Sequence, residues 1–173
     1  NSANSTLGGI ISNGGLTKTG PGVLVLNGVN TYSGSTTVSN GTLAGIGTIA
    51  GPLDVENPGN LAPGITGIGT LTVNGDVTLN GNTTVDVNAA TTGSDLVTGV
   101  ATANYGGTLT VNNLAGTLAA GQSYTLFSAT THTGTFASFS PANPNNDTAL
   151  AWSFANGVLS VVNATVAQPT LNV

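Results

Sequence analysis

The sequence consists largely of very short alternating segments separated by Asn-Gly and Gly-rich turns, and this pattern excludes most fold classes. In each segment Thr alternates with Val or Leu, a pattern typical of β-strands with one buried face. No pattern with the 3.6-residue period of a helix persists along the chain. The sequence therefore predicts an all-β chain with strands at 23–26, 70–73, 77–79, 84–87, 108–111 and 124–127, and with turns at 13–14, 27–28, 40–41, 74–75, 80–81 and 156–157.

A recurring Gly-Thr-Leu or Gly-Thr-Ile triplet favours a solenoid over a sandwich. Loose recurrence on the order of 20 residues, or multiples of it, is typical of stacked coils with unequal loops. Tyr32 is the only aromatic residue before position 100, so the first part of the chain can enclose only a narrow core of Val, Leu, Ile and Thr. We predict at most about eight coils spaced by roughly 4.8 Å, with Asn ladders between them. The triplets lie at 41–43, 47–49, 69–71, 107–109 and 116–118.

The C-terminal part differs, because it holds the other seven aromatic residues. Residues 150–162 predict an antiparallel hairpin around a type I′ Asn-Gly turn. Pairing about that turn places Phe154 opposite Leu159 and Trp152 opposite Val161 on one apolar face. We expect this hairpin to cover the open end of the solenoid, whose last coil would otherwise expose unpaired backbone groups. The expected cap residues are Trp152, Phe154, Asn156, Gly157, Leu159 and Val161. Residues 141–147 read as a loop, and residues 163–173 as an exit linker.

Charge narrows the partners of the chain. Gly, Thr and Asn fill 76 of 173 positions, whereas charged residues make up 4%. Lys18 is the only basic residue and the net charge is -5, so the chain lacks the cations that nucleic-acid binding requires. There is no Cys for a disulfide or thiolate site, and no apolar run of about 18 residues to span a bilayer as a helix. A chain without Met that begins Asn-Ser-Ala-Asn is expected to be a fragment of a longer protein.

Candidate chemical sites are few, and we expect no enzymatic activity and no cofactor. His132 with Asp95 or Asp147 and a Ser would make a hydrolase triad, but no Gly-x-Ser-x-Gly motif is present and His132 is expected in an exposed loop. Asp54 and Glu56 share one strand face and are weak candidates for a metal ion, which would need more oxygen ligands.

Lys18 and the three tyrosines have structural interpretations as well as functional ones. Lys18 is expected to cap a turn beside an acidic group rather than to contact a ligand. Tyr32, Tyr105 and Tyr124 are expected in the core or at coil corners, with a sugar-stacking face as the alternative. β-Helical polysaccharide lyases need several basic residues, whereas this chain has one Lys and no Arg. β-Helical hydrolases need paired carboxylates, and Asp54 and Glu56 are the only acids close together in the sequence.

Residues 15–43, Gly-Leu-Thr-Lys-Thr-Gly-Pro-Gly-Val-Leu-Val-Leu-Asn-Gly-Val-Asn-Thr-Tyr-Ser-Gly-Ser-Thr-Thr-Val-Ser-Asn-Gly-Thr-Leu, carry a family resemblance. This segment resembles the autotransporter-associated β-strand repeat, also called the passenger-associated transport repeat. Segments at 61–64, 69–75, 94–99, 106–111 and 133–138 are similar to the C-terminal part of autotransporter passenger domains. The motif positions are Lys18, Gly20, Gly22, Asn30, Thr31, Tyr32, Gly34, Gly41 and Leu43.

The resemblance implies a right-handed parallel β-helix with a capping, autochaperone-like C-terminal end. It divides the chain into coils at 1–103, further coils and the cap at 104–162, and the exit linker at 163–173. It also implies a monomeric segment of a secreted or surface-displayed protein of a Gram-negative-type bacterium. An outer-membrane β-barrel of the same precursor would be its partner, and its role would be to promote export and folding and to act as a stalk. The alternative is an adhesin or glycan-binding module.

Overall fold

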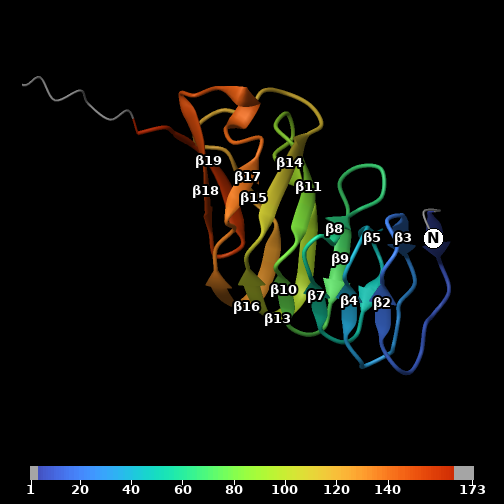
Figure 1. Ribbon diagram of the computed structural model, residues 1–173. Helices are drawn as coiled ribbons and strands as arrows, with labels where there is room; N and C mark the ends of the chain where they lie inside the picture. Colours follow the sequence, from blue (N-terminus) through green and yellow to red (C-terminus); the bar gives the residue numbers. More distant parts are fainter. Residues whose placement is uncertain (1–3, 166–173) are drawn as a thin grey trace, which may run out of the picture.

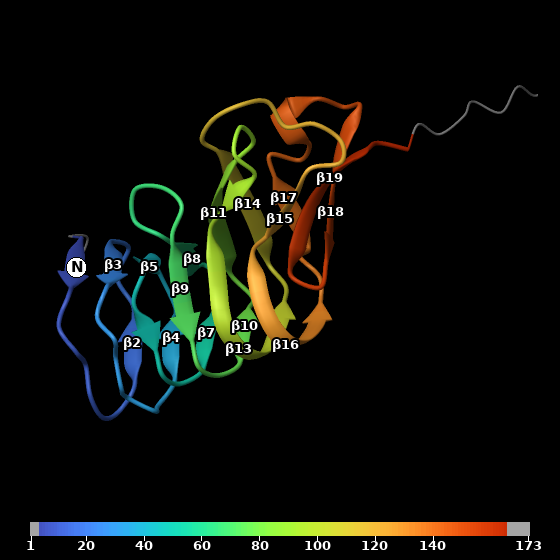
Figure 2. The same cartoon turned by 180° about the vertical axis from the view of Figure 1, so that it is seen from behind.

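The computed structural model describes residues 4–165 and shows a parallel β-helix closed at one end by an antiparallel hairpin (Figure 1). Turning the molecule by 180° shows the same order, with the N-terminal strands at one end of the rod and the hairpin at the other (Figure 2). The all-β, solenoid-like fold with its terminal hairpin is therefore confirmed. Among the described residues, no helix has the length and apolar character needed to cross a membrane.

One long sheet, sheet A, forms a continuous wall of the rod. Its strands are joined in parallel, and only the short β12 pairs antiparallel, with β11. Seven strands form the continuous path, in agreement with the expected upper limit on the number of coils. In order they are β1 (Ser5–Leu7), β3 (Val23–Leu26), β5 (Thr42–Gly45), β8 (Asn60–Pro63), β11 (Asn82–Asn88), β14 (Thr108–Asn113) and β17 (Ser138–Ser140), with β12 (Gly93–Ser94) beside β11.

A second sheet, sheet B, supplies the other walls. The C-terminal half of β13 pairs with β10, and its N-terminal half pairs with β9. Strands β6 and β9 therefore form a third face in the earlier coils, which merges with the β10 face in the single long strand β13. The strands are β2 (Leu16–Lys18), β4 (Thr36–Val38), β7 (Leu53–Val55), β10 (Val77–Leu79), β13 (Leu96–Tyr105), β9 (Thr70–Val73) and β6 (Thr48–Ile49), with β16 (Phe127–Gly134) beside β13.

The coils lengthen toward the C-terminus. Along the sheet A ladder the successive partners are 19, 18, 22, 26 and 30 residues apart. Coils of about 20 residues are thus found only in the first part, and the merged strands β13 and β16 enclose a wider interior later. The larger interior has room for aromatic rings, which accounts for their position in the sequence. The ladder consists of Leu24, Leu43, Leu61, Thr83, Leu109 and Phe139.

One core runs the length of the rod, formed by inward side chains of Leu, Val and Ile and then by aromatic residues. Four of the five Gly-Thr-Leu or Gly-Thr-Ile triplets begin a strand at their Thr, because the Gly lies in the preceding corner. These strands are β5, β6, β9 and β14, whereas the triplet at 116–118 lies in the connection between β14 and β15 (Ser123–Thr125). The triplet therefore marks the corner of a coil.

The strands predicted at 23–26, 70–73 and 77–79 are confirmed, and those at 84–87 and 108–111 lie within longer strands. The strand predicted at 124–127 is wrong, since the chain leaves β15 at Thr125 and enters β16 at Phe127. At this point Leu126 N and Phe127 N both donate to Gly157 O of the hairpin, at 2.9 and 3.1 Å. This contact with the cap, which sequence patterns do not encode, divides the strand.

Two expectations about the C-terminal connections also change. The loop at 141–147 contains a short 3-10 helix, η1 (Pro144–Asn146), which begins with the rigid Pro144. Asn163 is not linker but the last residue of β19 (Val158–Asn163), paired with Leu150 at the start of β18 (Leu150–Ala155). The rest of the predicted linker lies mostly outside the described residues.

Candidate functional site

Lys18, at the end of β2, binds two successive corners of the β-helix. Its Nζ donates to Asn40 O at 3.0 Å and also to Gly20 O, so it joins the turn after β2 to the turn after β4. Gly41 has φ +73°, and a Cβ there would lie 2.2 Å from Gly20 O as well as 2.4 Å from this Nζ, so this corner has no room for a side chain. Burial lowers the pKa of Lys18 from its ordinary value of 10.5.

The expectation that Lys18 lies beside an acidic group is wrong for the described residues, because both partners of its ammonium group are backbone carbonyls. The expected turn capping is present, however. Corner carbonyls that point out of a coil have no partner within their own strand, and an ammonium group with three donors can satisfy two of them together.

Asn30 connects three coils. Its side chain is 2% exposed, its Oδ1 accepts from Ile11 N at 2.9 Å, and its Nδ2 donates to Gly28 O at 3.2 Å and Thr48 O at 2.9 Å. Ile11 belongs to the preceding coil and Thr48 to the following one. Asn30 therefore fixes the spacing of the stack as well as the shape of its own corner.

The rest of the repeat motif packs around this corner. Tyr32 is fully buried and its hydroxyl lies 2.6 Å from Thr36 Oγ1. Gly34 N donates to Gly14 O at 2.9 Å, and a Cβ on Gly34 would lie 2.3 Å from the same oxygen. Leu43 is fully buried, whereas Thr31 is exposed and bonds Ile11 O through its backbone N–H. Gly20 O receives the Lys18 ammonium, and Gly22 O accepts from Thr42 N at 3.2 Å.

The hairpin of β18 and β19 closes the C-terminal end as the sequence predicts. Phe154 pairs with Leu159 and Trp152 with Val161. Asn156 and Gly157 have φ of +50° and +80°, the positive values that a type I′ turn requires. Strand β15 pairs with the other edge of β19, so the cap is a three-stranded antiparallel sheet.

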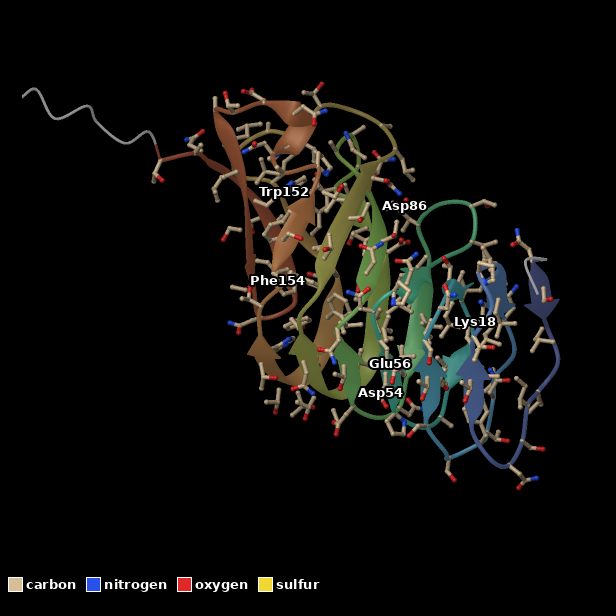
Figure 3. All side chains as sticks on the ribbon, in the orientation of Figure 1. Lys18, Asp54, Glu56, Asp86, Trp152 and Phe154 are labelled. Atoms are coloured by element: carbon tan, nitrogen blue, oxygen red, sulfur yellow. The ribbon has the colours of Figure 1, made fainter. Side chains whose placement is uncertain are left out.

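Aromatic contacts attach the cap to the last coils. The ring of Phe154 lies 4.8 Å from Tyr105 and 4.9 Å from Phe136, both edge to face. Trp152 Nε1 donates to Pro141 O at 3.0 Å (Figure 3). Edge-to-face aromatic pairs add about 0.5–1.5 kcal/mol each beyond area burial, so the hairpin is held by contacts that a Leu and Val core alone would not provide.

His132 lies in β16 and not in an exposed loop, so that expectation is wrong. It is half-buried, and its Nδ1 lies 2.6 Å from the Tyr105 hydroxyl, whose pKa burial raises. His132 is part of a strand because β16 pairs in parallel with β13, with His132 opposite Ala103. The Ser and Thr residues around His132 give this segment the polar composition of a loop, so the strand was not recognised from the sequence. The structure does not join His132 to the triad candidates by hydrogen bonds, since Asp95 accepts from Gly69 N and Asp86 N, and Asp147 from Ala149 N.

Asp54 lies on the outer face of β7, and Glu56 directly after that strand accepts from Ser39 Oγ at 2.8 Å (Figure 3). Within residues 4–165, no group of three or more His, Cys, Asp or Glu is placed to hold a metal ion. Tyr32, Tyr105 and Tyr124 are each at most 7% exposed, so none of the three presents a ring face for a sugar.

The expected amide ladder lies on the outer face of sheet A. Asn82 Nδ2 donates to Asn60 Oδ1 at 2.8 Å, and Asn60 Nδ2 donates to Thr42 Oγ1 at 3.3 Å. Thr84 and Thr110 hydroxyls donate to Asn60 and Asn82, both at 3.0 Å. The ladder links strands β5, β8, β11 and β14 through their side chains.

Sequence reasoning missed the pairing of Asp86 with Asp95. The two acids are nine residues apart, and the reversal from β11 into β12 returns the chain so that Asp86 N donates to Asp95 Oδ2 at 2.8 Å. The run Asn88-Ala-Ala-Thr-Thr-Gly93 between them, ending in Gly, is the only signal of that reversal. Burial, opposed by backbone hydrogen bonds, raises the pKa of Asp95 from 3.8 to about 6.

The segment that contains Lys18 and Asn30 is similar to a known family of sequence repeats. The sequence model of the passenger-associated-transport-repeat family matches residues 16–44. Fold and match together define a parallel β-helical chain that carries an autotransporter passenger repeat. The matched segment covers β2, β3 and β4 and most of β5, so the motif residues are those that bind neighbouring coils to one another. No curated protein matches the chain.

Proposed function

We propose that this chain is a structural segment of an autotransporter passenger, secreted or displayed on the surface of a Gram-negative-type bacterium, where it supports export and folding and serves as a stalk. The observation that carries the proposal is the polarity of the rod. Aromatic contacts and a three-stranded cap cover the C-terminal end, while β1, among the described residues, pairs on one side only, with β3.

This polarity suits growth of the β-helix from the C-terminus. Once the cap and the last coils have folded, each new strand can pair with a finished parallel edge. The conformational entropy lost when a coil is ordered is then offset by the hydrogen bonds and packing that the coil forms with its folded neighbour. Asn30 and Lys18 favour the same mechanism, because each satisfies backbone groups of two neighbouring corners at once. The partner in this proposal is an outer-membrane β-barrel of the same precursor.

Pulsed hydrogen exchange during refolding of the chain tests the proposal. Amides of β13, β16 and β19 should become protected before those of β3 and β5. Phe154→Ser should slow protection throughout the rod, whereas Val162→Ser, an exposed position on the same hairpin, should leave it unchanged. Protection that begins in β3 and β5, or a Phe154 variant that refolds at the normal rate, would contradict the proposed role of the cap.

Export provides the second test. With the chain placed before an outer-membrane β-barrel, surface display measured by protease accessibility should fall for Phe154→Ser and not for Val162→Ser.

The proposed role is non-enzymatic and monomeric. The hydrogen bond of His132 to Tyr105, rather than to a carboxylate, supports a non-enzymatic role.

A glycan-binding role is the second candidate, and the outward Asn and Thr ladder of sheet A favours it. A regular row of side-chain amides and hydroxyls can donate hydrogen bonds to the hydroxyl groups of a sugar chain and accept hydrogen bonds from them. Next to the ladder, a hollow of about 370 Å³ is lined by Asn57, Asn82, Thr110 and Ser140, among others. Binding on a glycan array that Asn82→Ala abolishes would support this role, and a blank array at high protein concentration would exclude it.

A further inference from the structure

The loop between β8 and β9, residues 64–69, protrudes from the rod (Figure 1). It carries exposed apolar side chains. Ile65 and Ile68 of this loop are 49% and 43% exposed, and Ile46 beside them is 53% exposed. The three side chains line one hollow, which we call the isoleucine patch. On a rod whose outer faces consist largely of Thr and Asn, three adjacent exposed isoleucines are unusual and mark an interaction surface.

A second hollow of about 220 Å³ adjoins the patch and shares Ile65 with it. We call it the acidic hollow, since Asp86 and Asp95 are its only charged lining residues. The other lining residues, from β5, β8, β11, β14 and the loop, are uncharged. Figure 3 shows Asp86 near the base of the loop.

The two carboxylates have different tasks. Asp95 is 2% exposed, and its oxygens accept from Gly69 N and Asp86 N, both at 2.8 Å, so it holds the end of the loop against β11. Asp86 is only half-buried, and its Oδ1 accepts from Asn112 Nδ2 at 3.2 Å. Its Oδ2 has no hydrogen-bond donor among residues 4–165 and remains available to a ligand.

We propose that the acidic hollow and the isoleucine patch together dock a basic segment of another protein. A Lys or Arg side chain of the partner enters the hollow and pairs with Asp86, while an apolar neighbour in the partner covers Ile46 and Ile68. The inference concerns a different face from the cap and does not depend on the proposed function.

Charge selects this occupant over the others. The chain has a net charge of -5, which opposes anionic membranes and nucleic acids. A second copy of the chain cannot supply the cation, because its single base, Lys18, is buried against backbone carbonyls. A partner cation would also relieve the repulsion between the Asp86 and Asp95 charges.

Fluorescence anisotropy with the complete 173-residue chain tests the proposal. The probe is a fluorescein-labelled peptide, Gly-Ser-Ile-Arg-Ile-Ser-Gly, and the matched probes carry Gln for Arg or Ser for both Ile. We expect saturable binding of the first peptide alone. Its affinity should fall as the salt concentration is raised from about 50 to about 300 mM, because salt screens the ion pair. Binding should also weaken below pH 6, where Asp95 takes up a proton and the hollow loses charge.

Variants locate the site. Asp86→Asn and the double change Ile65→Thr and Ile68→Thr should each weaken binding about tenfold, the effect of losing one charged hydrogen bond or a comparable apolar contact. Asp54→Asn, a half-buried acid on β7, and Ile10→Thr, an exposed isoleucine elsewhere, are the controls and should bind normally. Circular dichroism spectra and urea midpoints are measured for each variant to check that it is folded.

Three outcomes overturn the proposal. The first is no saturable binding of the Ile-Arg-Ile peptide. The second is equal weakening by Asp54→Asn and Asp86→Asn, which would mean attraction to overall negative charge without a site. The third is displacement of the peptide by CaCl2 in amounts too small to act through ionic strength, with Ca²⁺ binding lost in Asp86→Asn, which would make the acidic hollow a cation site.

Discussion

Thr83 provides the sharpest test of how the core is built. It lies on the inward face of β11, in register between Leu61 and Leu109. Its side chain is fully buried, and its Oγ1 has no hydrogen-bond partner among the described residues. A hydroxyl thus occupies one place in a row of leucines, and Thr83→Val should stabilise the protein.

The magnitude follows from two effects. Burying a hydroxyl without a partner costs about 1–3 kcal/mol, and the methyl group that replaces it gains about 0.8 kcal/mol from burial. Valine has the same branched shape and favours strands equally, so no cavity or strain opposes the change. We expect the free energy of unfolding to rise by about 2 kcal/mol, which shifts the urea midpoint by about 1 M for a slope near 2 kcal/mol/M.

Thr36→Val is the matched control. Thr36 is equally buried, but its hydroxyl lies 2.6 Å from the Tyr32 hydroxyl, so the substitution leaves a buried phenol without its partner. It should lower the free energy of unfolding by about 1–3 kcal/mol. Urea titrations followed by far-ultraviolet circular dichroism and by Trp152 fluorescence report on the whole rod and on the cap. If Thr83→Val destabilises the rod as Thr36→Val does, the Thr83 hydroxyl is hydrogen-bonded and the reasoning fails.

Three other predictions concern the corners, the ladder and the buried acid. Gly157→Ala should lower thermal stability far more than Gly14→Ala: both have positive φ, but an added Cβ meets Phe127 O at 2.1 Å in the first case and nothing within 4 Å in the second. Equal losses would show that φ alone matters. Asn60→Ala should cost about 1 kcal/mol in urea unfolding by breaking the sheet A ladder, and Asn80→Ala, at an exposed position in the turn after β10, should cost little. Asp95 has a pKa raised from 3.8 to about 6 in the folded chain, so its contribution to stability is fully present below pH 3.8 and is lost as the pH rises through 6. The stability of the native chain relative to Asp95→Asn should therefore fall by roughly 2 kcal/mol between pH 4 and 7, and a difference independent of pH would refute the assignment.

Local patterns were sufficient for much of the fold. Alternation identified the strands at 23–26, 70–73 and 77–79, and Asn156-Gly157 fixed the register of the hairpin, because each depends on a few neighbouring residues. The repeat motif was visible for the same reason, since its glycines and Lys18 act within one or two corners. Local reasoning was wrong about His132 and about the strand at 124–127, whose conformations depend on β13 and on the hairpin turn.

Local sequence patterns are enough to predict short strands with polar outer faces, glycine corners and a group of aromatic residues at the C-terminal end. The strands that stack, the lengthening of the coils from 18 to 30 residues and the contacts between distant groups depend on tertiary packing. Asp86 and Asp95 share a hollow, and Lys18 binds a carbonyl 22 residues away, because the pitch of the solenoid brings them together. The pitch is set by ladder pairing summed over every coil, a property that no single stretch of the sequence contains.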